Sequence, residues 1–218
     1  MQIMYDMVDA PDELHQVMAF LRDGHLAKLD WLEQEGLLSL NNDGTYVGSG
    51  GFGWTDDLPQ PDFIGRVRTC DLWGFGESQE TVGVSPKMFA EFVLPYQLPI
   101  LSRFGLNCYG CCEPLDQRWE YVKQIPRLRR VSVSPWSNRA LMAERLGANY
   151  ILSMKPNPAD LARDSFDEEK VRGILRADLR ATRDCRVEVI MKDNHTICND
   201  PHRVVRWVQM AREEAEKL

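Results

Sequence analysis

Hydrophobic and polar residues follow two different spacings along the second half of the chain. Short apolar or alternating runs, typical of strands, lie at 105–109, 130–134, 149–153 and 186–191. Longer stretches between them carry apolar residues three and four positions apart and predict amphipathic helices at 116–124, 137–146, 167–182 and 201–218. Strands and helices that alternate with short links predict parallel βαβ units.

The first half follows this pattern less closely. Apolar spacing predicts a long helix at 12–34, and residues 37–40 (LLSL) predict a short buried strand. Another helix is expected at 86–103, with Ser85 as its N-cap and a kink or end near Leu94 because Pro95 and Pro99 follow. The Gly-rich and Pro-rich stretch 41–83 has weak periodicity. Loops this long are usually functional or partly structured, and a pocket loop is expected there.

Five strand–helix units in 218 residues predict one α/β domain that spans residues 1–218. A composition of 44% hydrophobic and 27% charged residues is typical of globular proteins. The net charge of −7 argues against nucleic acid as the main partner. We find no apolar run of about 20 residues and no secretion-signal pattern, so a cytoplasmic protein without a membrane span is expected. Three of the six cysteines, Cys108, Cys111 and Cys112, form one tight group, and clustered cysteines in such a chain favour metal or redox chemistry over disulfides.

Polar side chains follow each predicted strand. In parallel α/β folds the active site forms beyond the carboxyl ends of the strands. The sequence places these residues there: Asn41, Asn42 and Asp43 after the first strand, Cys111, Cys112 and Glu113 after the second, Ser134 and Trp136 after the third, Lys155 and Asn157 after the fourth, and Lys192, Asp193, Asn194, His195 and Thr196 after the fifth. Taken alone, each of these residues is as consistent with a loop cap or a solvated charge as with a functional role. Their concurrence favours a site.

The segment 108–113 (CYGCCE) has the strongest metal-binding pattern in the chain. A catalytic zinc usually has three protein ligands from Cys, His and Asp or Glu, and one open position. Cys111 or Cys112, Glu113 and His195 form such a set, with Cys198 as an alternative ligand. The competing interpretation is that these cysteines are small packing residues at a crowded strand end.

The segment 73–80 (WGFGESQE) combines flexible glycines with acids just before a helix. This arrangement suits a loop that lines a pocket, with Glu77 or Glu80 as an acid, a base or a hydrogen-bonding group. The alternative is a solvated acidic loop. Gly-rich stretches elsewhere match no phosphate-binding pattern.

Three segments, in order, resemble the uroporphyrinogen decarboxylase (URO-D) superfamily. Residues 84–96 (VSPKMFAEFVLPY) resemble a helix motif of that superfamily, residues 146–158 resemble a late-strand segment, and residues 191–196 fall at its final strand end. The resemblance covers about residues 10–215. It implies a TIM-barrel-like fold of which this chain holds about the last five of eight β/α units, a partial barrel. The early strands would precede Met1, or the barrel would be completed by self-association.

The superfamily includes zinc-dependent, corrinoid-linked methyltransferases, and the resemblance implies a function of this kind. Cys111 matches the family's zinc-binding cysteine, Tyr109 stands where the family has a histidine, and Glu113 and His195 would complete the ligands. Glu77 and Asp193 would be the catalytic polar groups. The substrate, a small methyl donor or thiol acceptor, would contact Asn42, Gln79, Trp136, Lys155, Asn157 and Lys192. A corrinoid on a partner protein is the implied cofactor.

Two other functions remain open. The first is a cofactor-free decarboxylase for a uroporphyrinogen-like anionic substrate, in which Lys155 and Lys192 supply positive charge to the developing carbanion. The second is a non-catalytic partial barrel that acts as a binding or assembly partner. A shared fold does not decide among these three functions.

Overall fold

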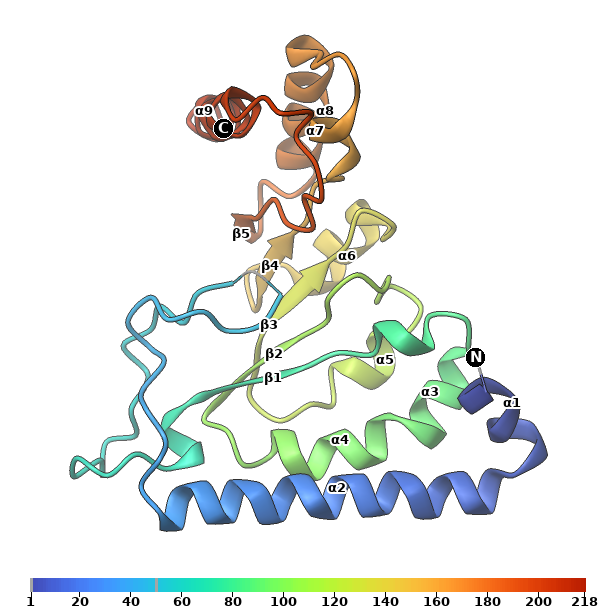
Figure 1. Ribbon diagram of the computed structural model, residues 1–218. Helices are drawn as coiled ribbons and strands as arrows, with labels where there is room; N and C mark the ends of the chain where they lie inside the picture. Colours follow the sequence, from blue (N-terminus) through green and yellow to red (C-terminus); the bar gives the residue numbers. More distant parts are fainter. Residues whose placement is uncertain (1, 50) are drawn as a thin grey trace.

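The structure of the protein is a computed structural model that describes residues 2–49 and 51–218 (Figure 1). Within these residues the sheet has five parallel strands, β1 (Trp73–Gly76), β2 (Leu106–Tyr109), β3 (Leu128–Val133), β4 (Ile151–Met154) and β5 (Arg186–Val189). The strands lie in the order β1-β2-β3-β4-β5. This order lacks the reversal of an open doubly wound sheet and is compatible with part of a β/α barrel.

Helices precede the sheet and alternate with its strands. Their bounds are α1 Gln2–Asp9, α2 Pro11–Gln34, α3 Pro86–Phe92, α4 Leu94–Leu101, α5 Trp119–Val122, α6 Arg139–Leu146, α7 Ala159–Ala162, α8 Glu168–Ala181 and α9 His202–Ala215, with short 3-10 turns η1 Thr69–Asp71 and η2 Gln79–Thr81. Figure 1 shows α2 along one end of the molecule, beside α4, and α8 with α9 at the other end.

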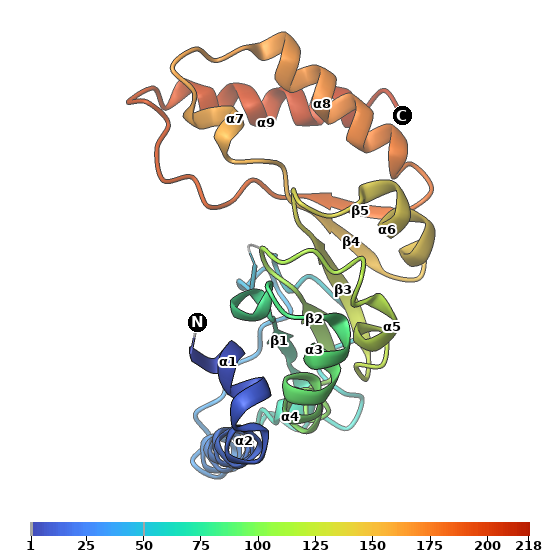
Figure 2. The same cartoon turned by 90° about the vertical axis from the view of Figure 1, so that its right-hand side faces the viewer.

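The main core lies between the sheet and the helices. Val131, Val133, Leu152 and Met154 alternate along β3 and β4 and are fully buried against α6 and α5. A second apolar cluster joins α8 and α9 through Val171, Leu175, Trp207 and Met210, as the close pair of helices in Figure 2 illustrates. Helix α8 therefore buries the apolar stripe that its spacing predicts, whereas Val17 and Leu21 of the stripe predicted for α2 are 53% and 49% exposed.

The opposite face of the sheet is polar although most of it is buried. On β3, Arg130 and Ser132 alternate with the core residues. Ser153 on β4 and Glu188 on β5 lie on the same polar side of the sheet. Arg130 Nε forms an ion pair with Glu188 Oε1 at 2.8 Å, and the Ser153 hydroxyl donates to the same Glu188 oxygen. We call this polar side of the sheet the inner face.

Residues 41–49 and 51–58 cover part of the inner face. Tyr46 pairs with Phe52 in an antiparallel bridge, and Arg130 Nη2 donates to the Phe52 carbonyl at 2.6 Å. Gly48 has a φ of +45°, and a Cβ there would overlap the Phe75 ring. The close approach of this turn to β1 therefore requires glycine.

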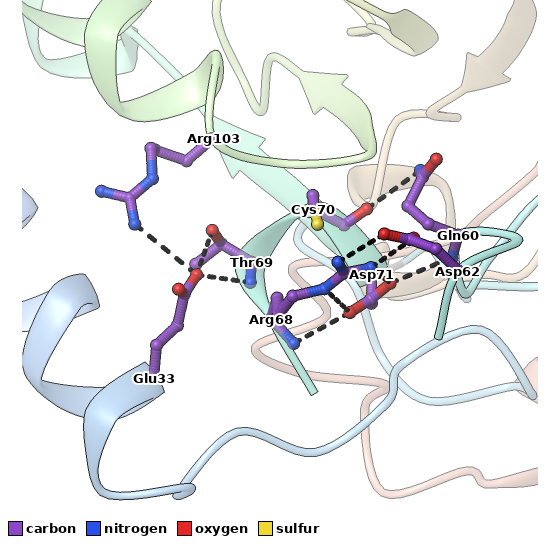
Figure 3. Close-up of polar contacts among 8 residues, drawn as sticks. All are labelled: Glu33, Gln60, Asp62, Arg68, Thr69, Cys70, Asp71 and Arg103. Carbon is purple, nitrogen blue, oxygen red and sulfur yellow. Dashed lines mark hydrogen bonds and ion pairs between the residues drawn. The ribbon is translucent and has the colours of Figure 1, made fainter. Parts of the chain in front are cut away.

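A polar network anchors the chain just before β1 (Figure 3). Asp71, fully buried, accepts from Arg68 Nε at 2.9 Å and from the backbone N–H of Gln60 at 3.0 Å. Glu33, at the end of α2, accepts from the backbone N–H of Thr69 at 2.7 Å. These bonds fix the amino end of β1, at the opposite end of the strand from Glu77.

The predicted strand at 37–40 is wrong. These residues have no regular structure, and the first strand is β1, inside the expected loop 41–83. Two glycines weaken the strand pattern of β1, because glycine has no side chain to pack. Gly74 is nonetheless required there, since a Cβ would meet Phe104 and Asn107.

The other elements agree with the predicted ones to within a few residues. The expected kink at 86–103 is a break at Val93 between α3 and α4, with Pro95 in the first turn of α4. Ser85 is the N-cap of α3 and accepts from the Met88 N–H at 3.2 Å. Helices α1 and α7 were not predicted.

Candidate active site

The carboxyl ends of four strands place reactive side chains at one edge of the sheet. Glu77 directly follows β1, Cys111 and Cys112 follow β2, Lys155 follows β4, and Lys192 lies three residues after β5. The parallel pairing brings together residues that are far apart in the chain. The expectation that strand ends converge is therefore met for Cys111, Cys112, Lys155 and Lys192, whereas Glu77 was expected in a pocket loop and follows a strand that was not expected.

Lys192 is the centre of the polar contacts at this edge. Its Nζ lies 3.1 Å from Cys111 Sγ, 3.2 Å from Cys112 Sγ and 2.9 Å from Asp193 Oδ2. Burial opposes the charged amine, but hydrogen bonds to Asp193 and the two sulfurs outweigh it and raise the pKa of Lys192. The ammonium is therefore a fixed positive charge at neutral pH.

The neighbours of Lys192 have complementary protonation states. Burial raises the pKa of the Cys112 thiol to about 11, with a smaller opposing effect from Lys192. Its S–H donates to Asp193 Oδ2 at 3.3 Å. Burial also acts against the Asp193 carboxylate, but the hydrogen bonds from Lys192 and Cys112 hold its pKa below the ordinary value. At pH 7 these three neighbouring groups are therefore the Lys192 ammonium, the neutral Cys112 thiol and the Asp193 carboxylate.

Lys155 is a buried amine at the end of the inner face. Its side chain is 1% exposed and donates through Nζ to the Ser153 hydroxyl. Burial lowers the pKa of Lys155 to about 8. Glu188 and Cys108 oppose this effect, whereas Arg130 and Lys192 add to it through charge repulsion.

A small cavity of about 90 Å³ joins these groups. Its lining includes Cys112, Lys155, Lys192 and Asp193. Trp136 and Asn157, two predicted substrate contacts, complete its rim, and Trp136 is 69% exposed. One ordered water needs about 10 to 15 Å³ of such space, so the cavity has room for several waters or for a carboxylate-bearing group.

Glu77 does not line this cavity but lines a separate pocket beside α2 and α4. Burial raises the pKa of its carboxyl to about 7, and the nearby Glu80 and Glu113 carboxylates add to the shift. A hydrogen bond with Cys111 and the charge of Lys192 act in the opposite direction. A carboxyl that titrates near neutral pH suits general acid–base chemistry.

Glu113 holds two strand ends together. Its side chain is completely buried, and its Oε1 accepts from the Ser78 N–H at 2.7 Å and the Ser78 hydroxyl at 3.1 Å. Its Oε2 accepts from the Cys111 N–H at 2.9 Å. Both carboxylate oxygens are therefore used to join the loops after β1 and β2.

The predicted zinc ligands do not come together as a set. The Glu113 carboxylate already accepts hydrogen bonds from N–H donors, and His195 is exposed on the loop after β5. The Lys192 ammonium lies against the cysteine sulfurs, where a metal cation would bind. In the part of the chain described, no three His, Cys, Asp or Glu side chains are placed to share a metal ion. The residues of this chain do not fit the zinc that the resemblance implies.

Two predicted substrate contacts lie outside the cavity. The Asn42 side chain donates to the Leu58 carbonyl at 2.5 Å, in the segment that covers the inner face, because the strand expected before it does not form. Gln79 lies in η2 and donates to Glu80 Oε1 at 3.4 Å. Neither side chain belongs to the lining of the cavity.

The sequence interpretation missed the inner-face network that surrounds Lys155. It named neither Ser153 and Glu188 nor the pairing of Cys112 with Asp193 as parts of a site. Polar residues at every second position of β3, together with Ser153 and Lys155 on β4, indicated a polar inner face. The partners of those residues depend on strand order, which the pattern does not provide.

No protein-family model and no curated protein matches this chain. Over residues 2–49 and 51–218, none of the helices has the length and apolar character needed to cross a bilayer.

Proposed function

We propose that the strand-end cavity is the active site of a decarboxylase that acts on an anionic substrate with the chain's own side chains. The observation that carries the proposal is the pair of lysines, Lys155 and Lys192, that lines one cavity together with a neutral Cys112 thiol. The resemblance of the sequence to the uroporphyrinogen decarboxylase superfamily supports the same conclusion.

Each group has a distinct task in this reaction. The Lys192 ammonium holds the substrate carboxylate by charge and hydrogen bonding. Loss of CO₂ leaves an electron pair on carbon, and positive charge already fixed at Lys192 and Lys155 stabilises the developing negative charge without reorganisation. The Cys112 thiol then donates a proton to that carbon, and its sulfur is left beside the Lys192 ammonium.

The size of the cavity limits what enters it. About 90 Å³ admits a carboxylate-bearing side chain or the end of a small acid, whereas a complete tetrapyrrole would extend past Trp136 into solvent. The zinc methyltransferase that the resemblance implies has less support, because Lys192 lies against the two sulfurs where the metal would bind.

The test is the release of labelled CO₂ from two substrates. One is uroporphyrinogen labelled in its acetate carboxyl groups, and the other is acetoacetate labelled in its carboxyl group. We expect the protein to accelerate release from at least one substrate over a protein-free blank. Lys192→Ala should reduce the acceleration by about 10²- to 10³-fold, the usual cost of removing one stabilising charge.

Lys28→Ala is the matched control, because Lys28 is an exposed lysine of α2 outside the cavity lining. It should leave the rate unchanged. Release at the blank rate from both substrates would overturn the proposal, and so would a Lys192→Ala variant with the activity of the original chain.

A further inference from the structure

Lys155 is a buried cation without an acidic partner. Among the described residues no carboxylate lies within ion-pair distance of its Nζ, which donates instead to the neutral Ser153 hydroxyl. The Glu188 carboxylate is nearby but is engaged by Arg130 at 2.8 Å and by Ser153. An unpaired buried ammonium is costly, so a stable fold has no obvious need of it.

We propose that Lys155 is a nucleophilic amine that forms an imine with the ketone carbonyl of an oxo acid bound in the strand-end cavity. The inference deepens the proposed function, on which it rests, by naming the substrate class. An amine in a dry site beside other cations is the usual setting for imine chemistry, because the reactive form is the neutral amine.

The cavity has complementary groups for both ends of an oxo acid. The Lys192 ammonium binds the carboxylate, and Lys155 lines the same cavity to receive the carbonyl carbon. The charged groups that act on Lys155 are Arg130 of β3, Glu188 of β5 and Lys192 after β5, and the Cys108 thiol of β2 acts on it as well. The Ser153 hydroxyl accepts a hydrogen bond from the amine.

For a 3-oxo acid the reaction balances without a further co-reactant. The Lys155 nitrogen attacks the carbonyl carbon, the carbonyl oxygen leaves as water, and the imine that forms takes up a proton from solvent on its nitrogen. The bond between carbon 2 and the carboxylate carbon breaks, CO₂ leaves, and its electron pair passes through carbon 2 to the imine nitrogen, which gives an enamine. The Cys112 thiol protonates carbon 2, water hydrolyses the resulting imine to release the ketone, and solvent reprotonates Cys112.

The test traps the imine on the complete chain with pyruvate and sodium cyanoborohydride. Pyruvate reports imine formation independently of decarboxylation, since the reduced adduct is stable. The tryptic peptide 146–163 contains Lys155 and no other lysine, so its mass identifies the site. At pH 7 a lysine with a pKa of about 8 has on the order of a hundredfold more neutral amine than a surface lysine.

We expect saturable labelling of Lys155 at low pyruvate concentration and far slower labelling of the exposed Lys28. Labelling of Lys155 should approach its plateau rate above pH 8. Lys155→Arg keeps the positive charge but cannot form an imine, so it should abolish the adduct in peptide 146–163. Lys28→Arg is the control and should leave that labelling unchanged.

The two proposals fail in different ways. Labelling of Lys155 that is no faster than that of Lys28 would overturn the imine inference. CO₂ release from uroporphyrinogen alone, which has no ketone, with no Lys155 adduct would overturn it while leaving the decarboxylase intact. A Lys155 adduct without CO₂ release from either substrate would support the imine inference and overturn the decarboxylase.

Discussion

The Nζ of Lys192 lies 3.1 Å from the Sγ of Cys111, although the two residues are 81 positions apart in the chain. The contact exists because β2 and β5 end at the same edge of a parallel sheet. It puts a positive charge against a thiol pair that would otherwise be the best soft-metal ligand of the molecule.

The first prediction concerns zinc. We expect the protein to purify with far less than one zinc per chain, because an ammonium adjacent to both sulfurs opposes a second cation. Lys192→Ala removes that charge and should raise the affinity for zinc, as measured by titration with a zinc indicator. About one zinc per chain in elemental analysis of the unaltered protein, lost in Cys111→Ser, would instead restore the methyltransferase expectation.

The second prediction concerns the stability cost of Lys155. The pKa of this amine is about 8 in the folded protein and 10.5 in the unfolded chain. Between pH 8 and pH 10.5 the unfolded chain therefore binds more protons than the folded protein. Stability therefore rises with pH across this window, and below pH 8 the full penalty is present. Lys155→Met should raise the free energy of unfolding at pH 7 by about 3 kcal/mol.

The measurement for Lys155→Met is urea unfolding at a series of pH values. The difference between the variant and the original chain should shrink as pH rises from 8 to 10.5. A variant that is less stable at pH 7, with an unchanged slope against pH, would show that the ammonium stabilises the fold.

The third prediction concerns Glu77. Because the pKa of its carboxyl is raised to about 7 from 4.5, the native state binds more protons between these values. Stability therefore falls as pH rises through this window. Glu77→Gln should match the original chain at pH 4 and be more stable at pH 8 in thermal unfolding. The exposed Glu91→Gln is the control, and an equal pH response in both variants would contradict the assignment.

The fourth prediction concerns Glu113. Glu113→Gln replaces one accepting oxygen by an NH₂ group, which faces the N–H of Ser78 or of Cys111. Leaving such a buried group unpaired should cost about 1 to 3 kcal/mol in the free energy of unfolding. The exposed Glu144→Gln should cost far less. Equal unfolding midpoints for the two variants would mean that Glu113 does not join the strand ends.

The alternation of apolar and polar residues determined most of the fold. Local spacing predicted β2 to β5 and the long helix α2, and Pro95 and Pro99 predicted the break near Leu94. The same pattern failed at β1. Its two glycines have low strand propensity, and its stability comes from pairing with β2, a contact that sequence spacing does not reveal.

The sequence also predicted which side chains stand at strand ends, and Lys155, Lys192 and Asp193 all line the cavity. The tertiary structure alone decided what each of them does. Parallel pairing put Lys192, rather than His195, against the cysteines, and it put Glu113 against backbone N–H groups. Residue type and position along the chain determine which groups reach an edge, whereas charge balance and protonation depend on neighbours that only folding brings together.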